Sequence, residues 1–73
     1  MTEQLKPGTD VSWAWGAHRA KGRVEQVFTS PVSRTIRGTR VRRNASPENP
    51  AYLVTQPNGG YALKSHSELE RLQ

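Results

Sequence analysis

The chain has 73 residues and a formal net charge of +5, and hydrophobic residues make up 33% of it. Single domains usually run to about 100–150 residues, so this length allows one small domain and excludes TIM barrels and Rossmann-type enzymes. Because the chain contains no cysteine, disulfide frameworks, zinc fingers and thiol enzymes are excluded as well.

Valine, isoleucine, leucine and phenylalanine together number 13. This is just under the share of about one fifth at which disorder becomes an alternative, but two tryptophans and two tyrosines add large apolar groups. We therefore expect a folded domain with a thin core over residues 1–73, of which residues 1–6 are flexible. No apolar run has the length of a membrane span, and residues 1–10 lack the apolar core of a secretory signal, so we expect a cytoplasmic protein without membrane contact.

The first strand is predicted over residues 11–15, directly after a Pro-Gly turn signal. Val11, Trp13 and Trp15 alternate there with smaller or polar residues, and this period of two is typical of a half-buried strand.

A loop over residues 16–20 is expected to lead into a second strand over residues 21–28. Gly22, near the start of that strand, suggests a bulge or a bend of the kind found at barrel corners. Residues 33–43 alternate around a predicted turn at Gly38-Thr39 and indicate a pair of strands.

The second half of the chain begins with a polar loop over residues 44–50, which contains two prolines. A strand over residues 52–56, a turn over residues 57–60 and a strand over residues 61–64 follow. The Asn-Gly pair in this turn is a strong hairpin signal, since both residues tolerate positive φ.

The tail changes to helical spacing. Capping-box spacing joins Ser65 to Glu68 and Ser67 to Glu70, and two leucines follow three residues apart, at Leu69 and Leu72. We expect one helical turn that docks these leucines. About five short strands with tight turns and this final turn predict an all-β fold, a small SH3-like barrel.

The basic residues are concentrated in the middle of the chain. Residues 19–43 carry a net charge of +7, with Glu25 as the one acidic residue, whereas the remaining residues sum to −2. Clustered cations gain free energy on a phosphate backbone because counterions are released, so this segment favours an anionic partner. A solvated face that keeps the protein soluble is the alternative. The basic residues are Arg19, Lys21, Arg23, Arg34, Arg37, Arg40, Arg42 and Arg43.

Trp13 and Trp15 are predicted to share one face of a strand, near Phe28, Tyr52 and Tyr61. Exposed rings of this kind stack on bases, hold a methylated cation or bind a proline-rich peptide. The alternative is that they form the core, and with so few aliphatic residues at least one tryptophan must be structural. Five rings are too few for both a core and a full aromatic cage.

The remaining motifs indicate no catalytic or metal-binding site. His18 and His66 lack metal-ligand spacing, and no nucleophile or phosphate-loop motif is present, so we predict neither a metal site nor catalysis. Asn44-Ala45-Ser46 matches a glycosylation triplet, which we take as incidental. Asn44 and Ser46 are instead expected to bond neighbouring backbone groups, either presenting Arg42 and Arg43 on a rigid rim or ordering a crossover loop.

Four motifs lie along nearly the whole chain, over about residues 5–72: Val11-x-Trp13, Gly22-x-Val24, Arg43-x-Ala45-Ser46-x-x-x-Pro50-x-Tyr52, and Leu63-Lys64 followed by Ser67-x-Leu69. Together they resemble the hypervirulence-associated Tudor-domain family, a group of small microbial proteins formerly listed under a domain of unknown function. The resemblance implies a Tudor or SH3-like barrel and no catalytic residue. The motif residues expected to be structural are Val11, Trp13, Gly22, Ala45, Ser46, Pro50, Leu63, Lys64, Ser67 and Leu69.

These observations predict a non-catalytic binding module, without a cofactor, that associates with nucleic acid. Phosphate contacts are expected from Arg37, Arg40, Arg42 and Arg43, and base stacking from Trp15 or Tyr52. The alternative is a protein-interaction module that docks an acidic or modified peptide in an aromatic groove. A third possibility is a purely structural protein that acts by oligomerising through an exposed sheet edge.

Overall fold

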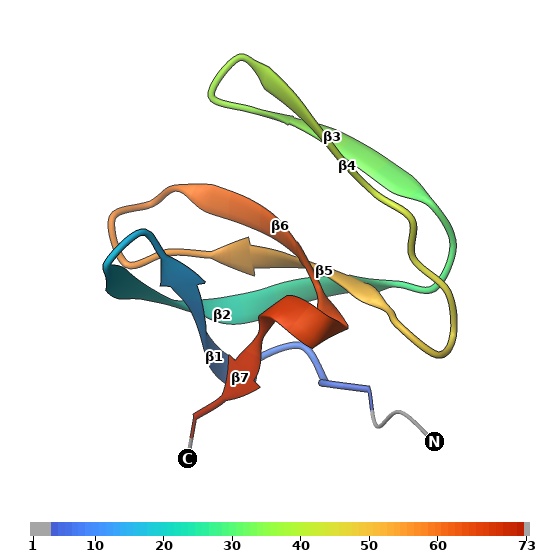
Figure 1. Ribbon diagram of the computed structural model, residues 1–73, viewed down its shortest axis with the longest axis horizontal. Helices are drawn as coiled ribbons and strands as arrows, with labels where there is room; N and C mark the ends of the chain where they lie inside the picture. Colours follow the sequence, from blue (N-terminus) through green and yellow to red (C-terminus); the bar gives the residue numbers. More distant parts are fainter. Residues whose placement is uncertain (1–3, 73) are drawn as a thin grey trace.

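The computed structural model describes residues 4–72 (Figure 1). Over these residues the strands form two antiparallel sheets, one of five strands in the order β6-β5-β2-β1-β7 and one of two strands, β3-β4. The elements are β1 (Asp10–Trp15), β2 (His18–Phe28), β3 (Val32–Ile36), β4 (Thr39–Arg43), β5 (Ala51–Thr55), β6 (Tyr61–Ser65), the 3-10 turn η1 (His66–Glu68) and β7 (Glu70–Arg71). The all-β expectation is confirmed. The strands exceed the expected number of about five, and the one that no predicted range covers is the short strand β7 in the tail.

β1 and β2 form a tight hairpin whose last pair is Trp15 with His18. Only two residues connect the strands, and Gly16 has a φ of 59°, as a two-residue turn with glycine in its first central position requires. The loop expected over residues 16–20 was therefore wrong, since three of its residues belong to β2.

The bulge in β2 lies beyond Gly22. The pairing of β2 with β5 shifts between Val24 and Gln26, so of the two expectations for Gly22 the bulge occurs farther along β2, and the bend stays a prediction. A Cβ on Gly22 would lie 2.5 Å from both the carbonyl oxygen of Thr55 and a methyl carbon of Val54. Glycine is needed there because the neighbouring strand approaches too closely for a side chain.

The β3–β4 hairpin stands apart from the five-stranded sheet, next to β6 (Figure 1). Its last pair is Ile36 with Thr39, so the turn is Arg37-Gly38, one residue earlier than predicted. Both turn residues have positive φ, 52° and 78°, which is the type I′ geometry that fits the twist of the flanking strands.

The remaining turns follow the sequence closely. In the β5–β6 connection, the Gly59 N–H donates to the Gln56 carbonyl over 2.9 Å, and Gly59 has a φ of 88°. Arg37 is the one non-glycine residue with positive φ among residues 4–72, so in the Asn-Gly pair only Gly59 has a positive φ.

At the tail, the Ser65 N–H donates to Glu68 Oε1 over 2.7 Å, which confirms the first capping spacing. The second spacing starts no helix, because Glu70 pairs with β1 as part of β7.

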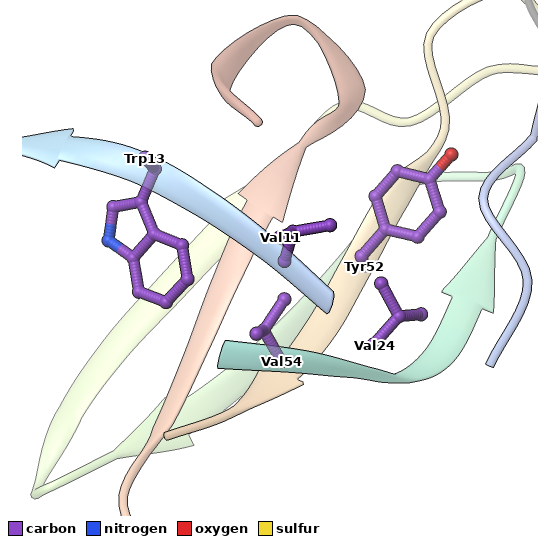
Figure 2. Packing of buried hydrophobic residues seen from close by; sticks show 5 residues of the cluster. All are labelled: Val11, Trp13, Val24, Tyr52 and Val54. Atoms are coloured by element: carbon purple, nitrogen blue, oxygen red, sulfur yellow. The ribbon is translucent and has the colours of Figure 1, made fainter. Parts of the chain in front are cut away.

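The core consists of two clusters. Val11, Trp13, Val24, Tyr52 and Val54 form the first, from strands β1, β2 and β5 (Figure 2). Further apolar side chains pack against it, including Leu5 and Leu69. The second consists of Ala45, Ala51 and Leu63, and the β3–β4 hairpin covers it with Val32, Ile36 and Val41.

The N-terminal segment is described from residue 4 onward. The Leu5 N–H donates to the Tyr52 hydroxyl oxygen over 3.1 Å, so this residue contacts the core. Residues 1–3 lie outside the described residues, and the flexibility expected for residues 1–6 stays a prediction.

Candidate functional site

Acidic side chains neutralise some of the arginines and leave others without a carboxylate partner. Glu70 pairs with Arg19, Asp10 with Arg23 and Glu68 with Arg43, at distances of 2.5, 3.2 and 2.8 Å. The first two pairs are strongly exposed and contribute little to stability. Their consequence is electrostatic, since they leave the positive charge of the chain concentrated elsewhere.

That charge lies on residues 32–43, the β3–β4 hairpin. This segment carries five arginines and no acidic residue, and we call it the arginine hairpin. Among residues 4–72, no carboxylate forms an ion pair with Arg37, Arg40 or Arg42. Arg42 Nε donates to the Asn44 side-chain oxygen over 3.4 Å, a contact that leaves its charge uncompensated.

The alternation of β4 separates its arginines onto two faces. Val41 packs inward against the second core cluster, and Arg43 on the same face reaches Glu68. Arg40 and Arg42 are exposed and point to the opposite face. Since the backbone positions of alternate residues in a strand are about 6.6 Å apart, the outer face presents two neighbouring cations.

Arg43 is held by Glu68 and takes no part in this outer face. Its Nε and Nη2 donate to the two carboxylate oxygens over 2.8 and 3.3 Å, and Lys64 Nζ lies 3.9 Å from the same carboxylate. Burial raises the pKa of Glu68, but hydrogen bonds from Arg43 and the Ser65 N–H, together with the charges of Arg43 and Lys64, outweigh it and lower the pKa. These contacts of Glu68 connect β4 to η1.

Arg34 is also held, by an aromatic ring. Its guanidinium carbon lies 4.9 Å from the centroid of the Phe28 ring, and Nη1 donates to the Ser33 carbonyl over 2.9 Å. This geometry is that of a cation–π contact, which keeps the charge but restricts the side chain.

Arg37 occupies the tip of the arginine hairpin and leans toward the β5–β6 turn. Its Nη2 lies 3.2 Å from the position that a Cβ on Gly60 would occupy. The left-handed backbone is uncommon for a residue with a long side chain and costs roughly 1–2 kcal/mol. Asparagine or glycine is the usual residue at this point of such a turn.

A cavity of about 600 Å³, which we call the hairpin groove, lies between the arginine hairpin and the ends of the other two hairpins. Trp15, from the β1–β2 hairpin, is 67% exposed, and Tyr61, from the β5–β6 hairpin, is 49% exposed. No aspartate or glutamate lies among the described residues that line it. The lining consists of Trp13, Trp15, Ala20, Ile36, Arg37, Val41, Arg43, Gln56, Asn58, Tyr61, Ala62, Leu63 and Lys64.

A second cavity of about 510 Å³ is also lined by Tyr61. It shares Ile36, Arg37 and Asn58 with the hairpin groove, but Glu25 also lines it. The hairpin groove is therefore the site better suited to an anionic ligand.

The comparison with protein families agrees with this small barrel. The model described as "Hypervirulence associated proteins TUDOR domain" matches residues 8–69. The chain belongs to this family. A search of curated proteins and a search of solved structures gave no match. As a Tudor domain, the protein has the architecture of a small binding module, and the expected Tudor-like barrel is confirmed.

The family-motif residues of this Tudor domain lie mostly in the core and its supports. Val11, Trp13, Ala45, Pro50 and Leu63 are buried. The others occupy the close approach at Gly22, the core contact at Leu69, the η1 region at Lys64 and Ser67, and the loop after β4 at Ser46.

The loop after β4 is fixed as expected at one of its two polar positions. Ser46 Oγ accepts a hydrogen bond from the Asn49 N–H over 3.1 Å, and Asn49 Oδ1 accepts one from the Ser67 N–H over 3.2 Å. Asn44 instead bonds the side chain of Arg42. The backbone contact expected for Asn44 does not occur among the described residues.

The two aromatic candidates lie in different surroundings. Trp15 is exposed beside the hairpin groove, whereas Tyr52 is fully buried in the first core cluster. Its ring cannot stack on a base from there, and burial raises the pKa of its hydroxyl. Trp13 is buried as well, so the expectation that at least one tryptophan is structural is confirmed.

Tyr61 was expected near the tryptophans, but Trp15 and Tyr52 were chosen as the stacking residues in its place. It shares a strand face with the buried Leu63 but lies at the end of β6, directly after the turn, just as Trp15 lies beyond Trp13 at the end of β1. The available signal was this terminal position, since the first or last residue of an alternating strand extends past the elements that cover its neighbours.

Over residues 4–72 no group of histidine, aspartate and glutamate is arranged to hold a metal ion. The described part of the chain also has no helix with the length and apolarity needed to cross a membrane.

Proposed function

We propose that this Tudor domain is a non-catalytic module that binds nucleic acid through the arginine hairpin. The observation that carries the proposal is the distribution of charge: Arg37, Arg40 and Arg42 have no carboxylate partner in the described part of the chain, while Arg19, Arg23 and Arg43 are each paired. Concentrated guanidinium groups favour phosphate because binding releases condensed counterions and the planar fork matches phosphate oxygens.

Within this proposal, Arg40 and Arg42 contact neighbouring phosphates from the outer face of β4. Arg37 contacts the strand where it passes the tip of the hairpin. The ion pair with Glu68 removes Arg43 from the expected set, because a phosphate would have to displace a carboxylate that makes two hydrogen bonds.

The test is the salt dependence of binding to a labelled oligonucleotide, followed by fluorescence anisotropy of the label. The plot of log affinity against log salt concentration should be steep. It should become shallower by about two units in the double variant Arg40→Ala/Arg42→Ala, one for each phosphate that the variant no longer neutralises.

The matched control is the double variant Arg19→Ala/Arg23→Ala, which changes the net charge equally but removes arginines that are paired with carboxylates. Its salt slope should stay close to that of the unmodified protein. Equal slopes in both double variants would show that the effect is one of net charge, and the hairpin would then not be the binding face.

A second candidate is an acidic peptide docked in the hairpin groove. It is favoured by the exposed Trp15 and Tyr61 beside Arg37, in a groove that no described acidic residue lines. The same positive charge disfavours a methylated cationic side chain, because Arg37 would repel a second cation in the groove. A peptide-binding groove would bind a polyglutamate peptide that an oligonucleotide does not displace at physiological salt.

A further inference from the structure

Two large aromatic side chains are exposed on a protein that has very few apolar residues. Only five residues are aromatic, and Trp15 and Tyr61 are the two whose rings are largely in solvent. They come from different hairpins and line the same groove. Aromatic rings presented on the walls of one cavity suit a flat, π-rich ligand.

The size and charge of the hairpin groove further restrict the class of ligand that it can bind. Its volume of about 600 Å³ lies within the range of pockets that hold small ligands. Three cationic side chains line it, and two of them, Arg43 and Lys64, share the single carboxylate of Glu68. Arg37 therefore supplies the free positive charge at the rim, beside the outer face that carries Arg40 and Arg42.

Two amide side chains add polar groups that suit the edge of a base. Gln56 and Asn58 both line the groove. The Gly60 N–H donates to Asn58 Oδ1 over 2.9 Å, which assigns this oxygen to the turn and leaves the NH₂ group to donate to a ligand. Amide groups of this kind hydrogen-bond to the edges of splayed-out bases.

From these observations we propose that the hairpin groove holds one unpaired nucleobase against Trp15 and Tyr61, so that the protein prefers single-stranded to double-stranded nucleic acid. The inference rests on the proposed function, because the arginine hairpin holds the phosphates of the same strand. In a duplex the faces of the bases are stacked on one another, and the rings of the groove have nothing to contact.

The experiment compares three labelled probes of equal length at one salt concentration: a single strand, the same sequence as a duplex, and an abasic single strand of sugar and phosphate alone. The base-bearing single strand should bind about tenfold or more tightly than the abasic strand, as expected for one stacked base. It should also bind more tightly than the duplex.

Variants of Trp15 distinguish the loss of base stacking from the loss of the folded structure. Trp15→Leu should abolish the preference for the base-bearing strand, and Trp15→Phe should retain much of it, because phenylalanine keeps a stacking face. The salt slope should be the same in both variants, since the phosphate contacts are made elsewhere. Urea denaturation of both variants checks that they are folded.

The outcomes distinguish this inference from the proposed function. Equal affinity for the three probes with a steep, arginine-dependent salt slope would overturn the base site and leave the proposed function standing. No binding of any probe at low salt would overturn both. Binding of a polyglutamate peptide that depends on Trp15, without binding of the abasic or base-bearing strands, would assign the groove to a protein partner.

Discussion

Glu68 links the arginine hairpin to the 3-10 turn, in addition to the apolar packing of the hairpin on the second core cluster. Its carboxylate accepts hydrogen bonds from Arg43, in β4, and from the backbone of Ser65, at the start of η1. Arg43 is more buried than the other arginines that form ion pairs, with 27% of its side chain exposed. This cluster therefore connects two parts of the chain that belong to different sheets.

The lowered pKa of Glu68 predicts a loss of stability in acid. The folded state holds the carboxyl group in its charged form below the ordinary value of 4.5, so the unfolded chain takes up more protons as the pH falls through that region. The contribution is fully present above that value and is lost as the pH falls through the lowered pKa. Urea unfolding between about pH 6 and about pH 3 should show a shallower decline for Glu68→Gln than for the unmodified protein.

Glu25→Gln is the matched control for this measurement. Glu25 is exposed and has no ion pair among residues 4–72, and its replacement alters the net charge by the same amount. If both variants change the decline equally, the acid sensitivity comes from total charge, and the pairing of Glu68 does not explain it.

Single residues also show what the sequence can predict. The alternation of apolar residues with a period of two correctly predicted the strand that carries Trp13 and Trp15. The small number of aliphatic residues correctly predicted that at least one tryptophan is buried. The pattern could not separate the two, because both rings lie on one face and only the packing of other strands decides which is covered. The same limit applies to Tyr52, whose burial depends on contacts with Leu5 and His66, each far away in sequence.

At the scale of elements, the sequence predicted features that depend on neighbouring residues. It did not predict contacts between strands or ion pairs between residues far apart in the chain. The Asn-Gly turn and the Ser65–Glu68 cap depend on neighbouring residues, and both features are present in the structure. The role of Gly22 depends on Thr55 and Val54 in another strand, so the sequence predicted a bulge or a bend and not the close approach that the structure has. Likewise, ion pairing of Arg43 rather than Arg42 depends on Glu68, which is distant in sequence.

The tip of the arginine hairpin combines a strained backbone with a proposed binding residue. Asparagine tolerates the left-handed conformation of Arg37 better than arginine does. Arg37→Asn should therefore raise the free energy of unfolding by about 0.5–1 kcal/mol in urea denaturation and should weaken oligonucleotide binding.

Arg40→Asn tests this explanation. It removes the same charge from the same hairpin, but at a strand position that has no positive φ to relieve. It should weaken binding without raising stability. A gain in stability of similar size from both variants would indicate relief of charge repulsion rather than relief of strain.

For the molecule as a whole, stability depends on close packing around a small number of buried side chains. Trp13 and Val54 pack in the first core cluster directly beside Gly22, where β1, β2 and β5 lie next to one another (Figure 2). A methyl group at this point would push apart the strand backbones that the cluster holds together.

Gly22→Ala is thus expected to lower the free energy of unfolding by about 1–3 kcal/mol, the usual cost of overpacking. Gly60→Ala is the control, because an added Cβ there would meet only the ends of side chains, at 3.1–3.3 Å, which can move aside. Urea denaturation of the two variants measures the difference. Similar losses would mean that the spacing of β2 and β5 is more adaptable than the structure indicates.

Trp13 and Trp15 are two positions apart in the chain, yet one is buried and the other is largely in solvent. Their intrinsic fluorescence therefore comes from two separate environments: an aqueous quencher such as iodide reaches Trp15 and is shielded from Trp13. With Trp15→Phe, the remaining emission reports unfolding of the core, and with Trp13→Phe it reports events at the groove. The protein thus contains its own optical probes for folding and for ligand binding, and neither measurement requires an attached dye.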